Sequence, residues 1–335
     1  MNVTAAGPAE PPAASILIAA HNAAAFLDGA VASALGQTRR DIEVVAVDDA
    51  SSDGTREMLD DWARRDGRFT ALRHERRRGA AAARNTAIEA ARGRWLAVLD
   101  ADDAFLPERI ERLVPMAEAA EADLFADNLV ERDFATGARL GTSMPAAEMA
   151  AMAAAGPVGL AEMLRRDRVD LPGRAKFGYL KPIVRRDFLQ RSRVRYQPGL
   201  RVGEDLLFYV ECVAAGGRFL LTPEAFYLYS VREGSASNAG DGALHLSAAT
   251  ERMRALARGR GDAELDALLR QRQRATASDC FDLAIEGRRL GDALRHARWA
   301  DPARVARRLG LAAGAVRRRL SGRFGGAPEA GNGRP

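Results

Sequence analysis

The chain has 335 residues, 47% of them hydrophobic, which is enough for one large domain and an appendage. Its two cysteines, Cys212 and Cys280, are too few for a disulfide framework and have no zinc-site spacing, so a reducing compartment is expected. The net charge of +5 combines a net of +9 in residues 251–323 with a net of −4 in residues 1–250. Only 6% of the residues are aromatic and no stacking motif accompanies the arginines, which argues against nucleic-acid binding.

The first thirteen residues are rich in Pro and Ala and lack the basic start and apolar segment of a signal peptide. This composition predicts a disordered N-terminal segment at residues 1–13. No run of about 18 uninterrupted apolar residues occurs, so no membrane-spanning helix is expected.

Strands and helices are predicted to alternate along residues 14–122. Short apolar runs predict strands at 14–20, 42–47, 69–73 and 95–99. Helical spacing and capping residues predict helices at 24–35, 55–63 and 80–91, and a fourth that opens at Pro107. This alternation indicates an α/β fold with a mostly parallel sheet.

Polar residues follow three of these predicted strands directly. Asn22, Asp49 and Asp102 each come just past a strand's carboxyl end. Open sheets of parallel strands bind ligands at that edge. The three positions therefore predict one shared site.

Beyond residue 123 the pattern becomes mixed. Residues 123–134 suggest further strands that could be antiparallel, and a helix is predicted at 204–215. Two separate strands are predicted at 219–222 and 225–229, followed by helices only after about residue 243.

Two acidic motifs suggest chemistry. Asp100 and Asp102 alternate in a loop that leaves a strand, which suits a divalent cation shared with phosphates, and a ribose hydroxyl. Asp205 opens an apolar helix and could take a proton from an attacking hydroxyl. The alternatives are structural: Asp-rich turns satisfy backbone amides, and acidic residues in a first turn complement the helix dipole.

The Asp49 cluster has two interpretations as well. A carboxylate beyond a strand can accept a hydrogen bond from a base's ring N–H, and Asp49 is placed for that. Residues 48–55 could equally be an ordinary loop and helix cap, with Ser51, Ser52 and Asp53 as capping groups.

Together these motifs resemble family 2 glycosyltransferases of the GT-A fold. The resemblance covers about residues 15–238 and rests on HN at 21–22, VDDASSDGT at 47–55, GAAAARN at 79–85, LDADD at 99–103 and GEDLLF at 203–208. Within the family the chain looks similar to bacterial exopolysaccharide enzymes of the succinoglycan type. One departure is Ala20-His21, where family members usually have Pro or Ser and then Tyr before the Asn.

The resemblance implies an inverting, metal-dependent transferase that uses a nucleotide-diphosphate sugar, often UDP-linked, with Mn²⁺ or Mg²⁺. It implies that Asp49 contacts the base, that Asp100 contacts the ribose or metal, that Asp102 binds metal, and that Asp205 is the base. The remaining residues expected to bind the nucleotide sugar are His21, Asn22, Arg84, Ala101, Glu204 and Arg232.

The resemblance also implies a domain organisation. Residues 14–240 would form the GT-A catalytic domain, with a nucleotide-binding half at 14–122 and an acceptor half at 123–240. Residues 241–322 would form a basic helical region, and 1–13 and 323–335 would be disordered. The acceptor would be a saccharide or a lipid-linked saccharide. A catalytically silent sugar-nucleotide-binding or assembly subunit of the same fold is the alternative.

Residues 301–320 predict a basic amphipathic helix. Asp301-Pro302 is a helix start, and Val305, Leu309, Ala312, Val316 and Leu320 share one face. Such a helix could lie on an anionic bilayer or pack on the protein with a solvated basic face. The expected location is therefore the cytoplasm, with peripheral contact at the inner face of the cell membrane under the first interpretation.

Overall fold

A computed structural model of the chain describes residues 10–167, 176–232, 242–287 and 289–310. Within these residues one mixed sheet has nine strands. The strands are β1 (Ala14–Ala20), β2 (Ile42–Asp48), β3 (Phe69–Arg73), β4 (Trp95–Asp100), β5 (Ala104–Phe105), β6 (Leu124–Asp133), β7 (Arg139–Thr142), β8 (Ile183–Arg185) and β9 (Phe219–Val231). Their order is β3-β2-β1-β4-β8-β6-β9-β5, with β7 paired to β6.

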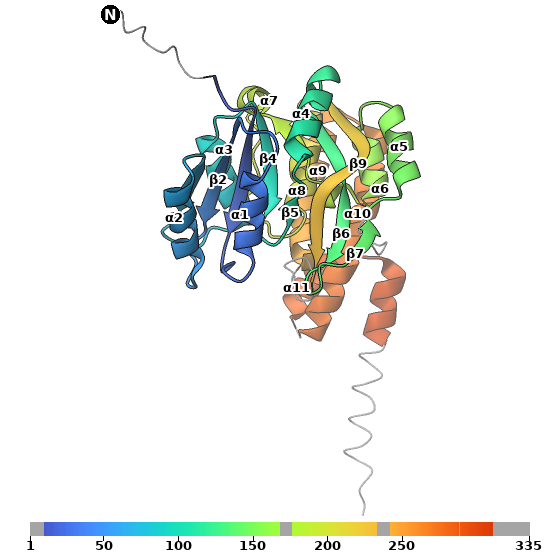
Figure 1. The fold of residues 1–335 in the computed structure, drawn as a ribbon. Helices are drawn as coiled ribbons and strands as arrows, with labels where there is room; N and C mark the ends of the chain where they lie inside the picture. Colours follow the sequence, from blue (N-terminus) through green and yellow to red (C-terminus); the bar gives the residue numbers. More distant parts are fainter. Residues whose placement is uncertain (1–9, 168–175, 233–241, 288, 311–335) are drawn as a thin grey trace, which may run out of the picture.

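The first four strands form the parallel half of the sheet (Figure 1). β1, β2 and β4 are almost wholly buried, which explains their continuous apolar runs: both faces of a parallel sheet are covered by helices. The predicted α/β fold and these four strands are confirmed. Their carboxyl ends meet at one edge, as the positions of Asn22, Asp49 and Asp102 required.

Helices connect and cover the strands. They are α1 (Leu27–Leu35), α2 (Thr55–Arg65), α3 (Ala80–Ala90), α4 (Arg109–Ala119), α5 (Ala146–Ala154), α6 (Leu160–Arg166), α7 (Arg186–Ser192) and α8 (Glu204–Ala214), with a 3₁₀ turn at Phe177–Tyr179. α3 packs on β1 and β2, and α1 contacts β2 and β5. α8 packs beside the 3₁₀ turn.

The second half of the sheet differs in part from the prediction. β6 is antiparallel to β7 and β8 but parallel to β9. The two strands predicted at 219–222 and 225–229 are one strand, β9, so that prediction was wrong. Pro223 interrupts the sequence pattern, but the strand continues through it. The pairing with β6 shifts register at this point, between Ala126 and Asn128, so the proline does not need to donate a hydrogen bond there.

A buried carboxylate ties β1, β2 and the start of β4 together. Glu43 on β2 accepts hydrogen bonds from Ser15 Oγ at 2.6 Å and from the Arg92 backbone N–H at 2.6 Å. Arg92 Nε donates to its other oxygen at 2.9 Å. Burial alone would raise the pKa of Glu43, but these hydrogen bonds outweigh it and lower the pKa.

The C-terminal helices are α9 (Gly242–Arg260), α10 (Ala263–Glu286) and α11 (Leu290–Ala297), followed by helical residues 302–310. Figure 1 shows them in orange beside the β6 and β9 half of the sheet. α9 contacts α8, and α10 contacts α6. In the part of the chain that the structure describes, no helix has the length and apolarity that a bilayer crossing requires.

The start of the predicted amphipathic helix packs on α10. Val305 contacts a small apolar cluster that includes Phe281, and Arg304 and Arg308 both donate to Asp282, at 2.8 and 3.0 Å. Leu309 is 51% exposed. The other residues of the predicted stripe, Ala312, Val316 and Leu320, lie outside the described residues, as do 1–9 and 323–335.

Candidate functional site

A cavity of about 410 Å³ opens at the carboxyl ends of β1 and β4 and reaches the start of α8. It brings together eight of the ten residues predicted for the site. They are His21, Arg84, Asp100, Ala101, Asp102, Glu204, Asp205 and Arg232. Asn22 and Asp49 are not among the residues that line it.

Asp49 shapes the loop that leads into α3. Its Oδ1 accepts from the Arg78 backbone N–H at 2.8 Å and lies 2.6 Å from His74 Nδ1, and its Oδ2 accepts from the Gly79 N–H at 2.7 Å. Burial raises the pKa of Asp49, but these hydrogen bonds outweigh burial and lower it. A contact between Asp49 and a nucleotide base stays a prediction.

Asn22 and His21 brace the same edge of the sheet. Asn22 has a positive φ of 50° and its Oδ1 accepts from the Ser52 N–H at 2.9 Å. His21 Nδ1 lies 2.9 Å from the Asp49 carbonyl oxygen. The two residues therefore join the loop after β1 to the loop after β2.

Arg84 connects α3 to both acidic motifs. Its buried guanidinium donates from Nη2 to Asp100 at 2.7 Å, and from Nη1 to Asp205 at 2.8 Å and Glu204 at 3.1 Å. It also lies over the Tyr196 ring, 5.2 Å from the centroid. Burial alone would lower its pKa, but the carboxylates outweigh burial and raise it.

Both oxygens of Asp100 are engaged by cations. Besides Arg84, which bonds Oδ1, Lys181 Nζ lies 3.0 Å from Oδ2. Burial would raise the pKa of Asp100, but Lys181 and Arg84 outweigh burial and hold it well below the usual range. Asp100 is thus an internal ion-pair partner here, and its role as a metal ligand stays a prediction.

Asp102 has one cationic partner, whereas Asp100 has two. The Asp102 side chain is 23% exposed, and Oδ2 accepts from Arg232 Nε at 2.8 Å. The described residues contain no group of three or more His, Cys, Asp or Glu side chains that could hold a metal ion. Mg²⁺ at phosphate sites needs only one or two protein carboxylates, because phosphates supply the other ligands. An oxygen ligand at Asp102 fits such an ion.

Asp103 is a buried member of the loop that the sequence did not single out. It accepts from Tyr227 Oη and from the Ser230 N–H, both at 2.7 Å, and so ties the loop to β9. Burial and repulsion from Asp100 and Asp102 raise its pKa well above the usual range. The only sequence signal was its place in the LDADD run.

Glu204 and Asp205 open α8 after Gly203, whose φ of +82° suits glycine. Both side chains are largely buried, 12% and 9% exposed. Burial, followed by repulsion from Asp205, raises the pKa of Glu204. Asp205 accepts from Arg84 at one oxygen and from Lys181 Nζ at the other, at 2.5 Å.

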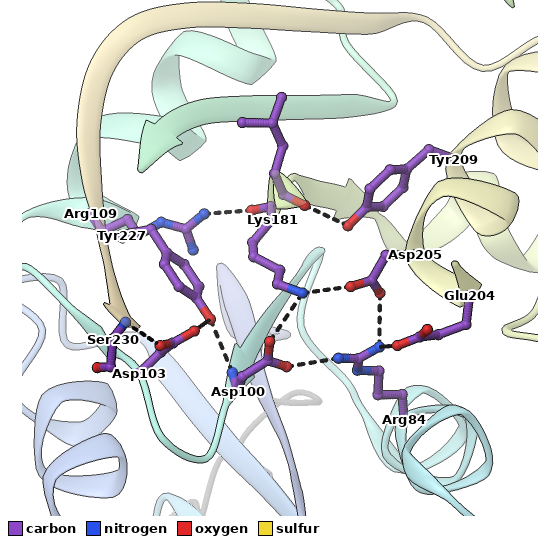
Figure 2. Close-up of polar contacts among 11 residues, drawn as sticks. Arg84, Asp100, Asp103, Arg109, Lys181, Glu204, Asp205, Tyr209, Tyr227 and Ser230 are labelled. Carbon is purple, nitrogen blue, oxygen red and sulfur yellow. Dashed lines mark hydrogen bonds and ion pairs between the residues drawn. The ribbon is translucent and has the colours of Figure 1, made fainter. Parts of the chain in front are cut away.

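Lys181 is the principal site residue that the sequence analysis missed. Figure 2 shows its ammonium between Asp100 and Asp205, opposite Arg84. Burial would lower its pKa, but Asp100 and Asp205 outweigh burial and raise it. A usable signal existed: only Lys176 and Lys181 are lysines among the chain's 50 basic residues, so lysine at these positions departs from the composition.

The far wall of the cavity includes a residue of the C-terminal helices. Arg272 on α10 is buried and its Nη1 lies 3.1 Å from Asp167 Oδ1. Asp167 Oδ2 in turn accepts from the Gly178 N–H at 2.7 Å. Tyr229 lines the cavity too, and burial raises its pKa to about 12.

Comparison with protein-family models finds a match to glycosyl transferase family 2 over residues 15–154. Two curated relatives from Rhizobium meliloti are the succinoglycan biosynthesis proteins ExoO, 38% identical over 228 residues, and ExoU, 35% identical over 240 residues. These alignments cover 68% and 70% of this chain. They span only 63% of ExoO and 66% of ExoU, less than two thirds of either relative.

Solved structures share the fold. S. aureus TarS 1–349 in complex with UDP-GlcNAc superposes with a TM-score of 0.58 at 18% identity, covering 80% of this chain and 72% of TarS. The mannosyltransferase PcManGT from Pyrobaculum calidifontis, in complex with GDP-Man and Mn²⁺, gives 0.53 at 19% identity, covering 94% and 89%. At this identity the likeness establishes the GT-A fold.

Proposed function

Since the chain belongs to glycosyltransferase family 2, we propose that it transfers a sugar, with inversion, from a nucleotide-diphosphate donor to a saccharide or lipid-linked saccharide. Its relatives in succinoglycan biosynthesis favour an acceptor from exopolysaccharide assembly. The observation that carries the proposal is the shared cavity, which holds Asp102 of the β4 loop and Asp205 of α8.

The donor would lie across the β1 and β4 edge. We propose UDP as the nucleotide, in keeping with the family resemblance and with the UDP-sugar bound by TarS. Asp49 would accept from the base, and Arg232, beside Asp102, would face the diphosphate. In an open α/β sheet this edge is the usual ligand site.

A divalent cation, Mn²⁺ or Mg²⁺, would be held by Asp102 and would stabilise the charge on the leaving diphosphate. Asp102 is the best candidate because one cation, Arg232, contacts it at Oδ2, whereas Asp100 is held by cations at both oxygens. Asp100 would serve only if the donor displaced one of its two cationic partners. PcManGT, which has the same fold, was solved in complex with GDP-Man and Mn²⁺.

Asp205 would act as the general base. The acceptor hydroxyl oxygen forms the new bond to the anomeric carbon, and the bond from that carbon to the diphosphate oxygen breaks. The diphosphate leaves with the electron pair, and the hydroxyl proton passes to Asp205. No covalent intermediate is needed, because one displacement inverts the centre.

A donor screen tests this proposal. Purified protein with Mn²⁺ would be given UDP-, GDP- and dTDP-linked sugars, with a membrane lipid extract as acceptor, and nucleotide release would be measured. We expect release from one UDP-sugar. Binding of UDP in calorimetry without any release would instead identify a silent sugar-nucleotide-binding subunit.

The location is proposed as the cytoplasm, at the inner face of the cell membrane. A lipid-linked acceptor would be presented there, and the net positive charge of residues 251–323 suits an anionic surface. Arg304 and Arg308 are already paired with Asp282, so the contact would depend on other arginines.

A further inference from the structure

Lys181 lies between the end of β4 and the start of α8. Its Nζ is 2.5 Å from Asp205 Oδ2 and 3.0 Å from Asp100 Oδ2 (Figure 2). The side chain is only 5% exposed, so water competes little for these contacts. Burying a lysine is unfavourable unless its charge is paired, and here two carboxylates pair it.

The two cations that bond to Asp205 contact different oxygens. Arg84 Nη1 donates to Oδ1 and Lys181 Nζ donates to Oδ2. A carboxylate held at one oxygen can still turn about its Cβ–Cγ bond, whereas one held at both oxygens is fixed in direction. Lys181 therefore supplies the restraint that Arg84 alone does not.

The backbone around Lys181 is itself held by buried groups. Its carbonyl oxygen accepts from Arg109 Nη2 at 2.6 Å, and the Leu180 carbonyl accepts from Tyr209 Oη at 2.7 Å. Arg109 is in turn fully buried and paired with Asp127 at 2.7 Å. Two helices, α4 and α8, thus fix the position of the backbone from which the Lys181 side chain extends into the cavity.

The choice of lysine also has a physical reason. An arginine fork has five donors in one plane, whereas the lysine ammonium is a compact charge on a flexible stem. A single nitrogen, Lys181 Nζ, lies 3.0 Å from Asp100 and 2.5 Å from Asp205, an arrangement that suits a point charge. The chain has only two lysines among 50 basic residues, so a lysine at this position departs from its general use of arginine.

We propose that Lys181 is a positioning residue for the transfer: its ammonium sets the direction in which the Asp205 carboxylate meets the acceptor hydroxyl. The inference rests on the proposed function, in which Asp205 is the base. It assigns Lys181 no contact with the substrate, and it predicts that the residue acts through Asp205.

A double-mutant cycle tests the inference, with nucleotide release from the donor found in the screen as the readout. Lys181→Met keeps the length of the side chain and removes the charge, and Lys181→Gln keeps a donor if the methionine variant fails to fold. We expect kcat to fall about a hundredfold with KM little changed, as misplacement of a reacting group typically does. In Asp205→Asn protein, adding Lys181→Met should lower kcat no further.

The controls separate the possible outcomes. Arg112→Met removes an exposed basic residue from α4 and should leave kcat and KM unchanged. UDP binding in calorimetry and the melting temperature show whether each variant is folded. Lys181 does not act through Asp205 if the loss of kcat in the double variant equals the product of the two single losses. The same conclusion follows if Lys181→Met raises KM and leaves kcat unchanged. A folded wild type that releases nucleotide from no donor overturns the proposed function, and this inference with it.

Discussion

The Asp205 carboxylate has two buried cations on its oxygens and lies in the cavity wall. Asp205→Asn keeps the shape of the side chain and removes the basic oxygen. We expect kcat to fall by about a hundredfold or more, the usual contribution of general base catalysis, while UDP binding is kept. Nucleotide release and calorimetry measure the two effects.

The matched control for that variant is Asp60→Asn, since Asp60 on α2 is half-exposed and forms a surface pair with Arg56. It should behave as wild type. Transfer at the normal rate by the Asp205→Asn protein would remove Asp205 from the mechanism.

Asp102 is expected to act on the donor instead. Asp102→Asn should weaken UDP binding in the presence of Mn²⁺ and leave the weaker binding without metal little changed, because only the metal-mediated part depends on the carboxylate charge. Calorimetry with Mn²⁺ and with EDTA gives both values. Equal losses under both conditions would mean that Asp102 contacts the nucleotide without a metal.

For single residues, the sequence predicted which ones belong to the site better than it predicted their contacts. Eight predicted residues line one cavity. His21 and residues 100–102 do so because the ends of β1 and β4 meet at one edge of the parallel sheet, whereas Arg84, Glu204 and Asp205 reach it from helices. The pairing of Asp100 with Arg84 and Lys181 was not predictable, since Lys181 reaches the site from a segment with no strong local motif. Asp103 was overlooked because its partners, Tyr227 and Ser230, are more than a hundred residues away.

Among the secondary-structure elements, the link from β2 to β1 and β4 depends on Glu43. Because its pKa is lowered in the folded protein, its stabilising effect is present above the ordinary value of 4.5 and is lost as the pH falls through the folded value. Glu43→Gln should therefore lower the free energy of unfolding by about 2 kcal/mol at pH 7. The difference from wild type should shrink below pH 4.5.

Urea unfolding at pH 7 and at acid pH checks this prediction. Glu57→Gln, an exposed position on α2, is the control and should change stability little at either pH. A Glu43 variant with the same deficit at every pH would show that packing, and not charge, is the cause.

How well an element could be predicted depended on how local its stabilising contacts are. The parallel strands follow apolar runs that the sequence displays directly. β9 was predicted as two pieces because Pro223 cannot donate to a ladder, and only the register shift against β6 reveals one continuous strand. β5 and β8, with two and three residues, depend wholly on pairing with distant strands.

For the whole molecule, attachment to a membrane is the property that the charge distribution predicts. Replacing Arg317, Arg318 and Arg319 with Gln should weaken binding to anionic vesicles by about a hundredfold, given about 1 kcal/mol for each arginine near the surface. Co-sedimentation with phosphatidylglycerol vesicles measures it.

Arg304→Gln and Arg308→Gln are the matched controls, because both arginines are already paired with acidic residues of α10. They should change vesicle binding less than the triple variant does. If neither set changes co-sedimentation, the basic C-terminal segment does not attach the protein to lipid.

Arg272 makes a residue of α10 part of the cavity wall, although the family match ends at residue 154. Exchanging modules between relatives at a junction near residue 240 would therefore replace part of the substrate's surroundings. Such a chimaera would keep its acidic motifs, but the part of the cavity wall that α10 supplies would come from the other relative. Its choice of acceptor should therefore follow the source of the C-terminal helices.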